Sequence, residues 1–169
     1  FSSSDSLFYS EVNIEIAKKF TKKFKAKLNY YHITFNADAN LVTQAHGMIY
    51  TNSGVFEGLI KFNRKNSLRF EFQALFTKQD RGNWTAFVAE YTISPHWFFV
   101  LIDQYNIGNP VQDDRIHYLY GSVGYIRKAT RISIAYGRQR EGIFCVGGVC
   151  RQVPASNGFN LTLTSSFQL

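Results

Sequence analysis

The C-terminal stretch Gly158 to Phe167 alternates strictly between apolar and uncharged polar residues. Phe159, Leu161, Leu163 and Phe167 fall at one parity, and Asn160, Thr162, Thr164 and Ser166 fall at the other. Successive side chains of a strand point to opposite faces, so this strand has one apolar and one polar face. Its length of about ten residues is what a tilted strand needs to cross a bilayer. The pattern is typical of the closing strand of an outer-membrane β-barrel.

Eight earlier segments show the same two-residue period and predict strands. They are residues 10–20, 25–35, 48–62, 68–76, 84–93, 97–105, 115–126 and 131–137. The segment 97–105 is apolar at both parities, which leaves its facing ambiguous, and Gly54 and Gly58 are candidate bulge or bend positions. About nine strands without helical periodicity predict a sandwich or a barrel.

The connections between these segments alternate between short and long. Short ones follow Phe20, Phe62, Ser94 and Arg127, and longer ones begin near Asn36, Lys78, Asn106 and Arg138. Short periplasmic turns and longer outer loops characterise outer-membrane barrels. We therefore predict an all-β, antiparallel up-and-down transmembrane β-barrel, formed as a single domain by residues 1–169.

An odd number of strands has a topological consequence. If the last strand ends at the periplasm, the first runs inward from the cell surface, whereas single-chain bacterial barrels have an even number of strands. We therefore expect further strands upstream of Phe1, so that this chain is the C-terminal part of a larger barrel. The strand count depends on the ambiguous segment 97–105 and on the unassigned residues Ser6 to Tyr9. With eight strands, the expectation of further upstream strands would no longer follow.

Charged residues within the strands share the parity opposite to the aromatic residues, and in a barrel they would face the lumen. They are Glu11, Glu15, Lys25, Lys27, Glu57, Lys61, Arg69, Glu71, Glu90 and Arg131. Charges inside a barrel must be hydrated or paired, which predicts either a wet, solute-selective channel or a lumen filled by cross-paired side chains. In a soluble sandwich the same alternation would put these charges in water, and alternation alone does not separate the two folds.

Aromatic residues make up 17% of the chain, with 16 Phe and 10 Tyr. This excess suits membrane strands, and rings near strand ends are candidates for the aromatic girdles at the membrane interfaces. The candidates are Phe20, Phe62, Trp84, Tyr91, Trp97, Tyr125 and Phe167. The mean hydropathy of −0.19 does not exclude a barrel, because the hydropathy values of alternating apolar and polar residues cancel in the mean.

The formal net charge is +7, but no run of Lys or Arg is longer than two residues. We therefore expect no nucleic-acid partner. The expected surroundings are outer-membrane lipid and lipopolysaccharide, with other envelope proteins as further candidate partners.

Two cysteines, Cys145 and Cys150, lie in one Gly-rich loop. Their spacing does not fit a redox Cys-x-x-Cys motif, and no second pair completes a zinc site. The spacing favours a local disulfide in an oxidising compartment, which would rigidify a surface loop. Two free thiols are the alternative.

A catalytic or metal site is not indicated by the sequence. Asp103, Asp113, Asp114 and His117 gather near one outer loop, where an Asp/His pair could activate water. Their spacing is not diagnostic, and the other histidines are scattered. We assign no catalytic residue, no metal ligand and no cofactor, and we do not expect an enzyme.

The stretch from Cys145 to Phe167, together with Tyr136 to Gly142 before it, resembles the C-terminal ends of a family of Bacteroidota outer-membrane barrel proteins with no assigned function. The resemblance implies the outer membrane of a diderm bacterium and a barrel with more strands than this chain supplies. It implies no activity and no catalytic residues.

Three hypotheses of function follow. The first is a porin- or transporter-like barrel that passes solutes across the bacterial outer membrane. The second is a non-conducting barrel subunit of an outer-membrane assembly. The third is a soluble, lipid-binding barrel of lipocalin type, which the size and a single disulfide would suit.

Overall fold

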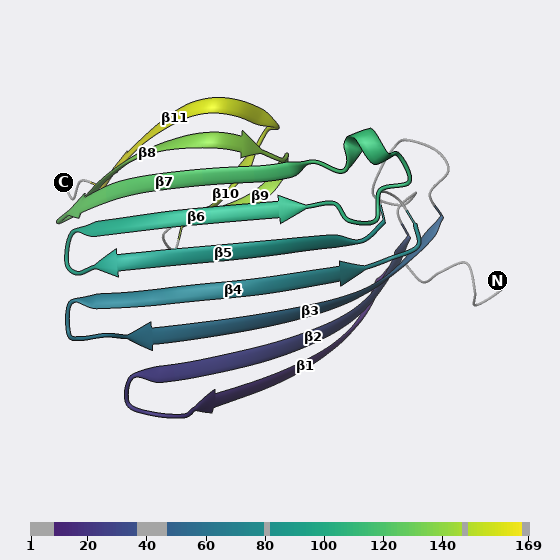
Figure 1. Cartoon of the computed structure of the whole chain (residues 1–169), viewed down its shortest axis with the longest axis horizontal. Coiled ribbons are helices and arrows are strands. Elements are labelled where there is room, and N and C mark those ends of the chain that lie inside the picture. Colours follow the sequence, from purple (N-terminus) through teal and green to yellow (C-terminus); the bar gives the residue numbers. More distant parts are fainter. Residues whose placement is uncertain (1–8, 37–46, 80–81, 147–148, 167–169) are drawn as a thin grey trace.

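A computed structural model describes residues 9–36, 47–79, 82–146 and 149–166. Nine strands form one antiparallel sheet in the order β1-β2-β3-β4-β5-β6-β7-β8-β11, and β9 pairs with β10 in a separate hairpin (Figure 1). A 3-10 turn, η1 (Gln112–Asp114), precedes β7. The strands are β1 (Tyr9–Lys19), β2 (Phe24–Asn36), β3 (Met48–Lys61), β4 (Asn66–Phe76), β5 (Trp84–Ile93), β6 (Trp97–Tyr105), β7 (His117–Arg127), β8 (Thr130–Gln139), β9 (Gly142–Val146), β10 (Val149–Val153) and β11 (Ser156–Ser165).

The predicted all-β, antiparallel up-and-down fold is confirmed, and the nine predicted strands correspond to the nine strands of the large sheet. The sheet is open, since β1 and β11 form its two edges. A closed membrane barrel therefore stays a prediction. The long connection before the last strand was expected to be a loop, but it contains the β9–β10 hairpin.

The alternation of connections places all tight turns at one end of the sheet. The segments 20–23, 62–65, 94–96 and 128–129 lie at this short-turn end, and the segments 37–47, 77–83, 106–116 and 140–155 connect strands at the opposite, long-loop end (Figure 1). Side-chain acceptors stabilise two of the turns. Thr21 Oγ1 accepts from the backbone N–H of Phe24 at 3.0 Å, and Asn63 Oδ1 accepts from that of Asn66 at 2.9 Å.

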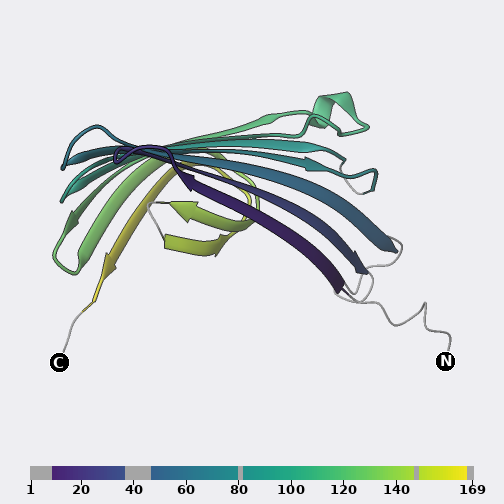
Figure 2. The ribbon, with the colours of Figure 1, turned by 90° about the horizontal axis from the view of Figure 1, so that it is seen from below.

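The sheet is strongly arched, and the β9–β10 hairpin lies under the arch (Figure 2). Directly opposite residues on neighbouring strands point to the same side, so the pairing register divides the sheet into a convex and a concave face. Every strand of the sheet contributes exposed apolar side chains to the convex face. Examples, one per strand, are Ile14, Leu28, Phe56, Phe72, Phe87, Leu101, Leu119, Ile134 and Leu161.

The facing of β6, ambiguous in the sequence, is resolved by the hairpin. Trp97, Phe99 and Leu101 lie on the convex face and are 41–47% exposed. Phe98, Val100 and Ile102 lie on the concave face and are 3–4% exposed, in a cluster with Tyr120, Ala135 and Val153 of β10. Because β10 covers this part of the concave face, β6 is apolar on both sides.

The glycines of the sheet do not form the expected bulges. The pairing of β2 with β3 runs without interruption from Phe24 opposite Ile60 to Asn36 opposite Met48. Instead, a neighbouring ring occupies the space where a side chain would begin: Phe70 lies over Gly58, and Phe98 lies over Gly124. At Gly58 and Gly124 the missing side chain thus makes room for a cross-strand aromatic ring, whereas a Cβ at Gly54 would meet nothing within 4 Å.

We predict that Gly124→Ala destabilises the fold by about 1–3 kcal/mol, because the new methyl group would displace the buried Phe98 ring. Gly121→Ala on the same strand is the matched control, since a Cβ there meets nothing within 4 Å. Equilibrium urea unfolding of both variants measures the difference. Equal destabilisation by the two substitutions would contradict this role of Gly124.

Candidate functional site

The ten charged residues predicted to face a lumen all lie on the concave face. The register connects them across the sheet: Lys27 lies opposite Glu57, Glu57 opposite Glu71, and Arg69 opposite Glu90. By the same register, Glu11, Glu15, Lys25, Lys61 and Arg131 share this face. Whether the face lines a lumen stays a prediction.

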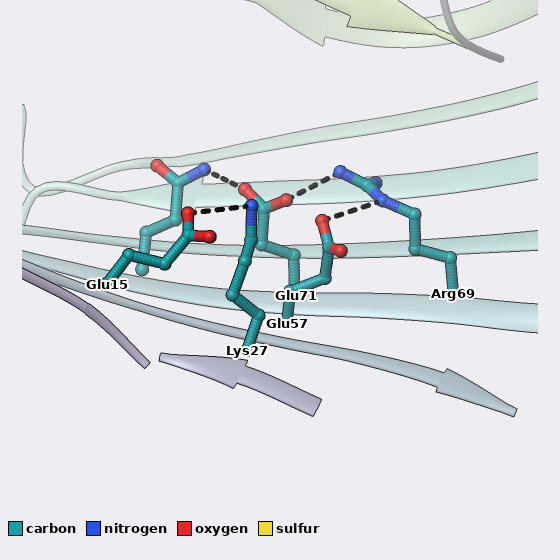
Figure 3. A network of polar contacts seen from close by, with 6 residues as sticks. Glu15, Lys27, Glu57, Arg69 and Glu71 are labelled. Atoms are coloured by element: carbon teal, nitrogen blue, oxygen red, sulfur yellow. Dashed lines mark hydrogen bonds and ion pairs between the residues drawn. The ribbon is translucent and has the colours of Figure 1, made fainter. Parts of the chain in front are cut away.

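Arg69 is the centre of a polar network on β3 and β4 (Figure 3). Its Nε donates to Glu57 Oε2 at 3.2 Å, and its Nη2 donates to Glu71 Oε2 at 2.6 Å. Gln73 Nε2 donates to the other oxygen of Glu71. Because Glu57 and Glu71 are direct cross-strand neighbours, their carboxylates would repel each other without the guanidinium between them.

A second ion pair lies nearer the sheet edge. Lys27 Nζ is 3.4 Å from Glu15 Oε2, and both side chains are more exposed than those of Glu57 and Glu71. Exposed pairs of this kind contribute little to stability. Further along the same face, the Arg131 guanidinium lies 4.0 Å from the ring centroid of Phe98, which is cation–π geometry.

The convex face carries charge only near the strand ends. In the described strands its charged residues are Lys18, Asp103, Arg127 and Arg138, each within two residues of the end of its strand. Asp103 is ion-paired with His117, whose Nδ1 is 2.8 Å from Asp103 Oδ2. The middle of the convex face is therefore a continuous apolar band.

The suggested Asp/His pair does form, but it lies on the convex face. The Tyr105 ring stacks on His117 with centroids 4.1 Å apart, while Asp113 and Asp114 lie in η1. Across the described ranges, no group of three or more His, Cys, Asp or Glu could hold a metal ion.

Most of the predicted interface aromatics gather at the short-turn end. Trp97 and Tyr125 meet edge to face with ring centroids 4.9 Å apart, and the ring centroids of Phe62 and Tyr91 are 6.3 Å apart. Phe20, just after β1, stacks on Phe24 at 5.5 Å. These rings mark one rim of the sheet.

One predicted interface aromatic within the described residues, Trp84, does not join this rim. Trp84 lies at the long-loop end of the concave face. Its ring centroid is 6.0 Å from that of Tyr118 and 4.4 Å from the guanidinium carbon of Arg140. Its parity is that of the concave face, and its place in an aromatic girdle stays a prediction. Phe167 lies outside the described residues.

Cys145 and Cys150 are directly opposite partners in the β9–β10 hairpin. Partner residues in antiparallel strands have Cα atoms about 4.5–5.5 Å apart, within the range that a disulfide spans. Their side chains lie outside the described part of the structure, so the disulfide stays a prediction. The hairpin backbone lies on the concave side of the sheet, whereas a surface loop was expected (Figure 2).

The hairpin is the feature that sequence reasoning missed. Its signal is the sequence Val146-Gly-Gly-Val149, since two glycines between β-branched residues are typical of a tight hairpin. Each strand has only five residues, too few to show a clear alternation.

These features define an all-β protein built on one open, arched antiparallel sheet with an apolar convex face and a charged concave face. The chain belongs to the family of unknown function DUF6029, which matches residues 1–167. Comparisons with curated proteins and with solved structures found no match. No helix in the described ranges is long and apolar enough to span a membrane.

We predict that Arg69→Gln lowers the free energy of unfolding by about 1 kcal/mol, because it leaves two facing carboxylates without their shared cation. Lys27→Gln, which breaks the more exposed pair, should cost less than about 0.5 kcal/mol. Urea unfolding at neutral pH compares the variants. The double variant Arg69→Gln/Glu71→Gln removes one of the two carboxylates. If it is no more stable than Arg69→Gln, repulsion between the carboxylates does not cause the loss of stability.

Proposed function

We propose that this chain forms part of the wall of an outer-membrane β-barrel through which polar or charged solutes pass. The observation that carries the proposal is the direction in which the sheet curves. The apolar face is convex, and the face that carries the ten predicted lumen-facing residues is concave. Lipid outside and water inside would match these two faces.

The direction of curvature speaks against a lipocalin-type barrel. A soluble barrel that holds a lipid would turn its apolar residues inward and its charges to the solvent. Here exposed apolar side chains cover the convex face across all nine strands. An apolar surface of this extent marks contact with a membrane or another protein.

The dimensions of the sheet also suit a bilayer. Its strands contain nine to fourteen residues, and about nine to eleven are needed for a tilted crossing. The aromatic rim and the terminal positions of the convex charges correspond to the interface regions. By the rule for such barrels, the short turns would face the periplasm.

Closure of the barrel by antiparallel pairing requires strands beyond the nine. β1 and β11 both run from the long-loop end to the short-turn end, so they cannot pair antiparallel with each other. Unpaired backbone groups at both edges are costly in hydrocarbon. We infer that an odd number of further strands joins β1 to β11, giving an even total.

The position of the hairpin favours a second candidate, a non-conducting barrel within an envelope assembly. β9 and β10 occupy the concave side, and Val153 is buried against Phe98, Val100 and Ile102. An oxidised Cys145–Cys150 pair would stiffen this hairpin. A hairpin fixed in the lumen would narrow or block a pore.

A pair of neighbouring substitutions on β4 tests the membrane proposal. Phe72→Arg on the convex face should abolish the heat-shifted band in unboiled gels of the outer-membrane fraction, because arginine at the bilayer midplane costs about 2–4 kcal/mol. Gln73→Arg, on the concave face, should retain it. A soluble wild-type protein without a heat shift would overturn the proposal.

Planar-bilayer recordings distinguish a pore from a non-conducting barrel. If solutes pass, Arg69→Glu or Lys61→Glu should shift the reversal potential toward cation selectivity, whereas Lys78→Glu, at an exposed position between β4 and β5, should not. Unchanged reversal potentials in both concave-face variants would count against a channel.

The hairpin can be tested in the same recordings. Gln139 and Ser156 are register partners, so a two-residue Gly-Ser turn can replace residues 140–155. Larger conductance after this replacement would identify the hairpin as a constriction, and the absence of conductance in both forms would favour the non-conducting barrel.

A further inference from the structure

The cationic residues of the chain are concentrated at the short-turn end. Eleven of its 19 lysines and arginines lie in the four turns or among the three terminal residues of the adjoining strand ends. They are Lys18, Lys19, Lys22, Lys23, Lys25, Lys61, Arg64, Lys65, Arg127, Lys128 and Arg131. The same positions, all of which the structure describes, contain no aspartate or glutamate.

Five of these cations line one hollow of about 670 Å³: Lys22, Lys23, Lys61, Arg64 and Lys65. Hydroxyl and amide side chains complete its wall, and none of its lining residues is acidic. A volume of this size is typical of small-molecule sites and far exceeds the needs of a single inorganic ion.

The segments that carry these cations are held together by main-chain hydrogen bonds. The N–H of Lys61 donates to the carbonyl of Lys23 at 2.7 Å, and the N–H of Ser94 donates to the carbonyl of Lys65 at 2.7 Å. Asn63 Oδ1 accepts from the N–H groups of Lys65 and Asn66 within the second turn. The backbone therefore brings the five cations to fixed neighbouring positions.

The five cations also have no ion-pair partner among the described residues. In the described part of the chain, none of them has a carboxylate within 4.0 Å, whereas Arg69 on the same sheet contacts two. Like charges held this close repel one another, and a bound anion would relieve the repulsion.

We propose that this hollow binds soluble anions that carry two or more phosphate groups. Lys and Arg both form charge-assisted hydrogen bonds to phosphate oxygens. The hollow includes Lys61, Ser67 and Thr92, which share the concave face, so it opens away from the apolar face that lipid would cover. This position favours a dissolved ligand over a lipid headgroup. The site goes beyond the proposed pore, and its binding assay needs no conductance.

Titration calorimetry of the purified protein in neutral detergent, with sodium tripolyphosphate as the probe, tests the site. The variant Lys23→Gln/Arg64→Gln/Lys65→Gln should bind about tenfold more weakly or worse. The matched control Lys18→Gln/Arg127→Gln/Lys128→Gln removes three cations from the same end but outside the hollow, and should change affinity less than about threefold. Thermal unfolding of both triple variants verifies that they are folded.

Three results would overturn the proposal. The first is that the wild-type protein does not bind tripolyphosphate in about 50 mM salt. The second is that both triple variants lose affinity equally, which would indicate diffuse attraction to the whole basic end of the sheet. The third is that the variant Lys23→Gln/Arg64→Gln/Lys65→Gln binds nanodiscs containing phosphatidylglycerol more weakly than the wild type but binds tripolyphosphate equally well. This result would assign the site to lipid headgroups. None of these results bears on whether the barrel conducts.

Discussion

The separation of apolar and charged side chains onto opposite faces of one curved sheet is the constraint on which the rest of the structure depends. Alternation sorts the side chains, and the unbroken register carries the sorting from β1 to β11. A slip of one residue in β4 would move both Arg69 and Glu71 to the apolar face and separate Arg69 from Glu57. The Arg69 network therefore fixes register as well as balancing charge.

The β9–β10 hairpin makes the two halves of the concave face different. Under β6 to β8 the concave face holds an apolar cluster that β10 covers, with Phe98 and Val100 almost fully buried. Under β1 to β4 it carries Glu15, Lys27 and the Arg69 network. A lumen bounded by this sheet would thus have one polar wall opposite a wall that holds the hairpin. The short-turn end adds a third zone, which is strongly basic.

Strands and faces could be predicted because both depend on local alternation. Leu68 to Phe76 shows why: a clean two-residue period determines both the strand and the side on which Arg69 lies. Other features depend on contacts distant in sequence. The facing of Trp97 to Ile102 depends on Val153, and the place of Gly124 depends on the Phe98 ring. The direction of curvature, which separates a membrane wall from a lipid-binding pocket, is a property of the whole sheet.

The two tryptophans provide the most direct test of the central claim, that the convex face contacts lipid. Trp97 lies on the convex face and Trp84 on the concave face. The variant Trp84→Phe leaves only the fluorescence of Trp97, and Trp97→Phe leaves only that of Trp84. Both variants are reconstituted into bilayers whose acyl chains are brominated near the glycerol. If the convex face contacts lipid, bromine should quench Trp97 and spare Trp84. Quenching of Trp84 with no effect on Trp97 would contradict this claim.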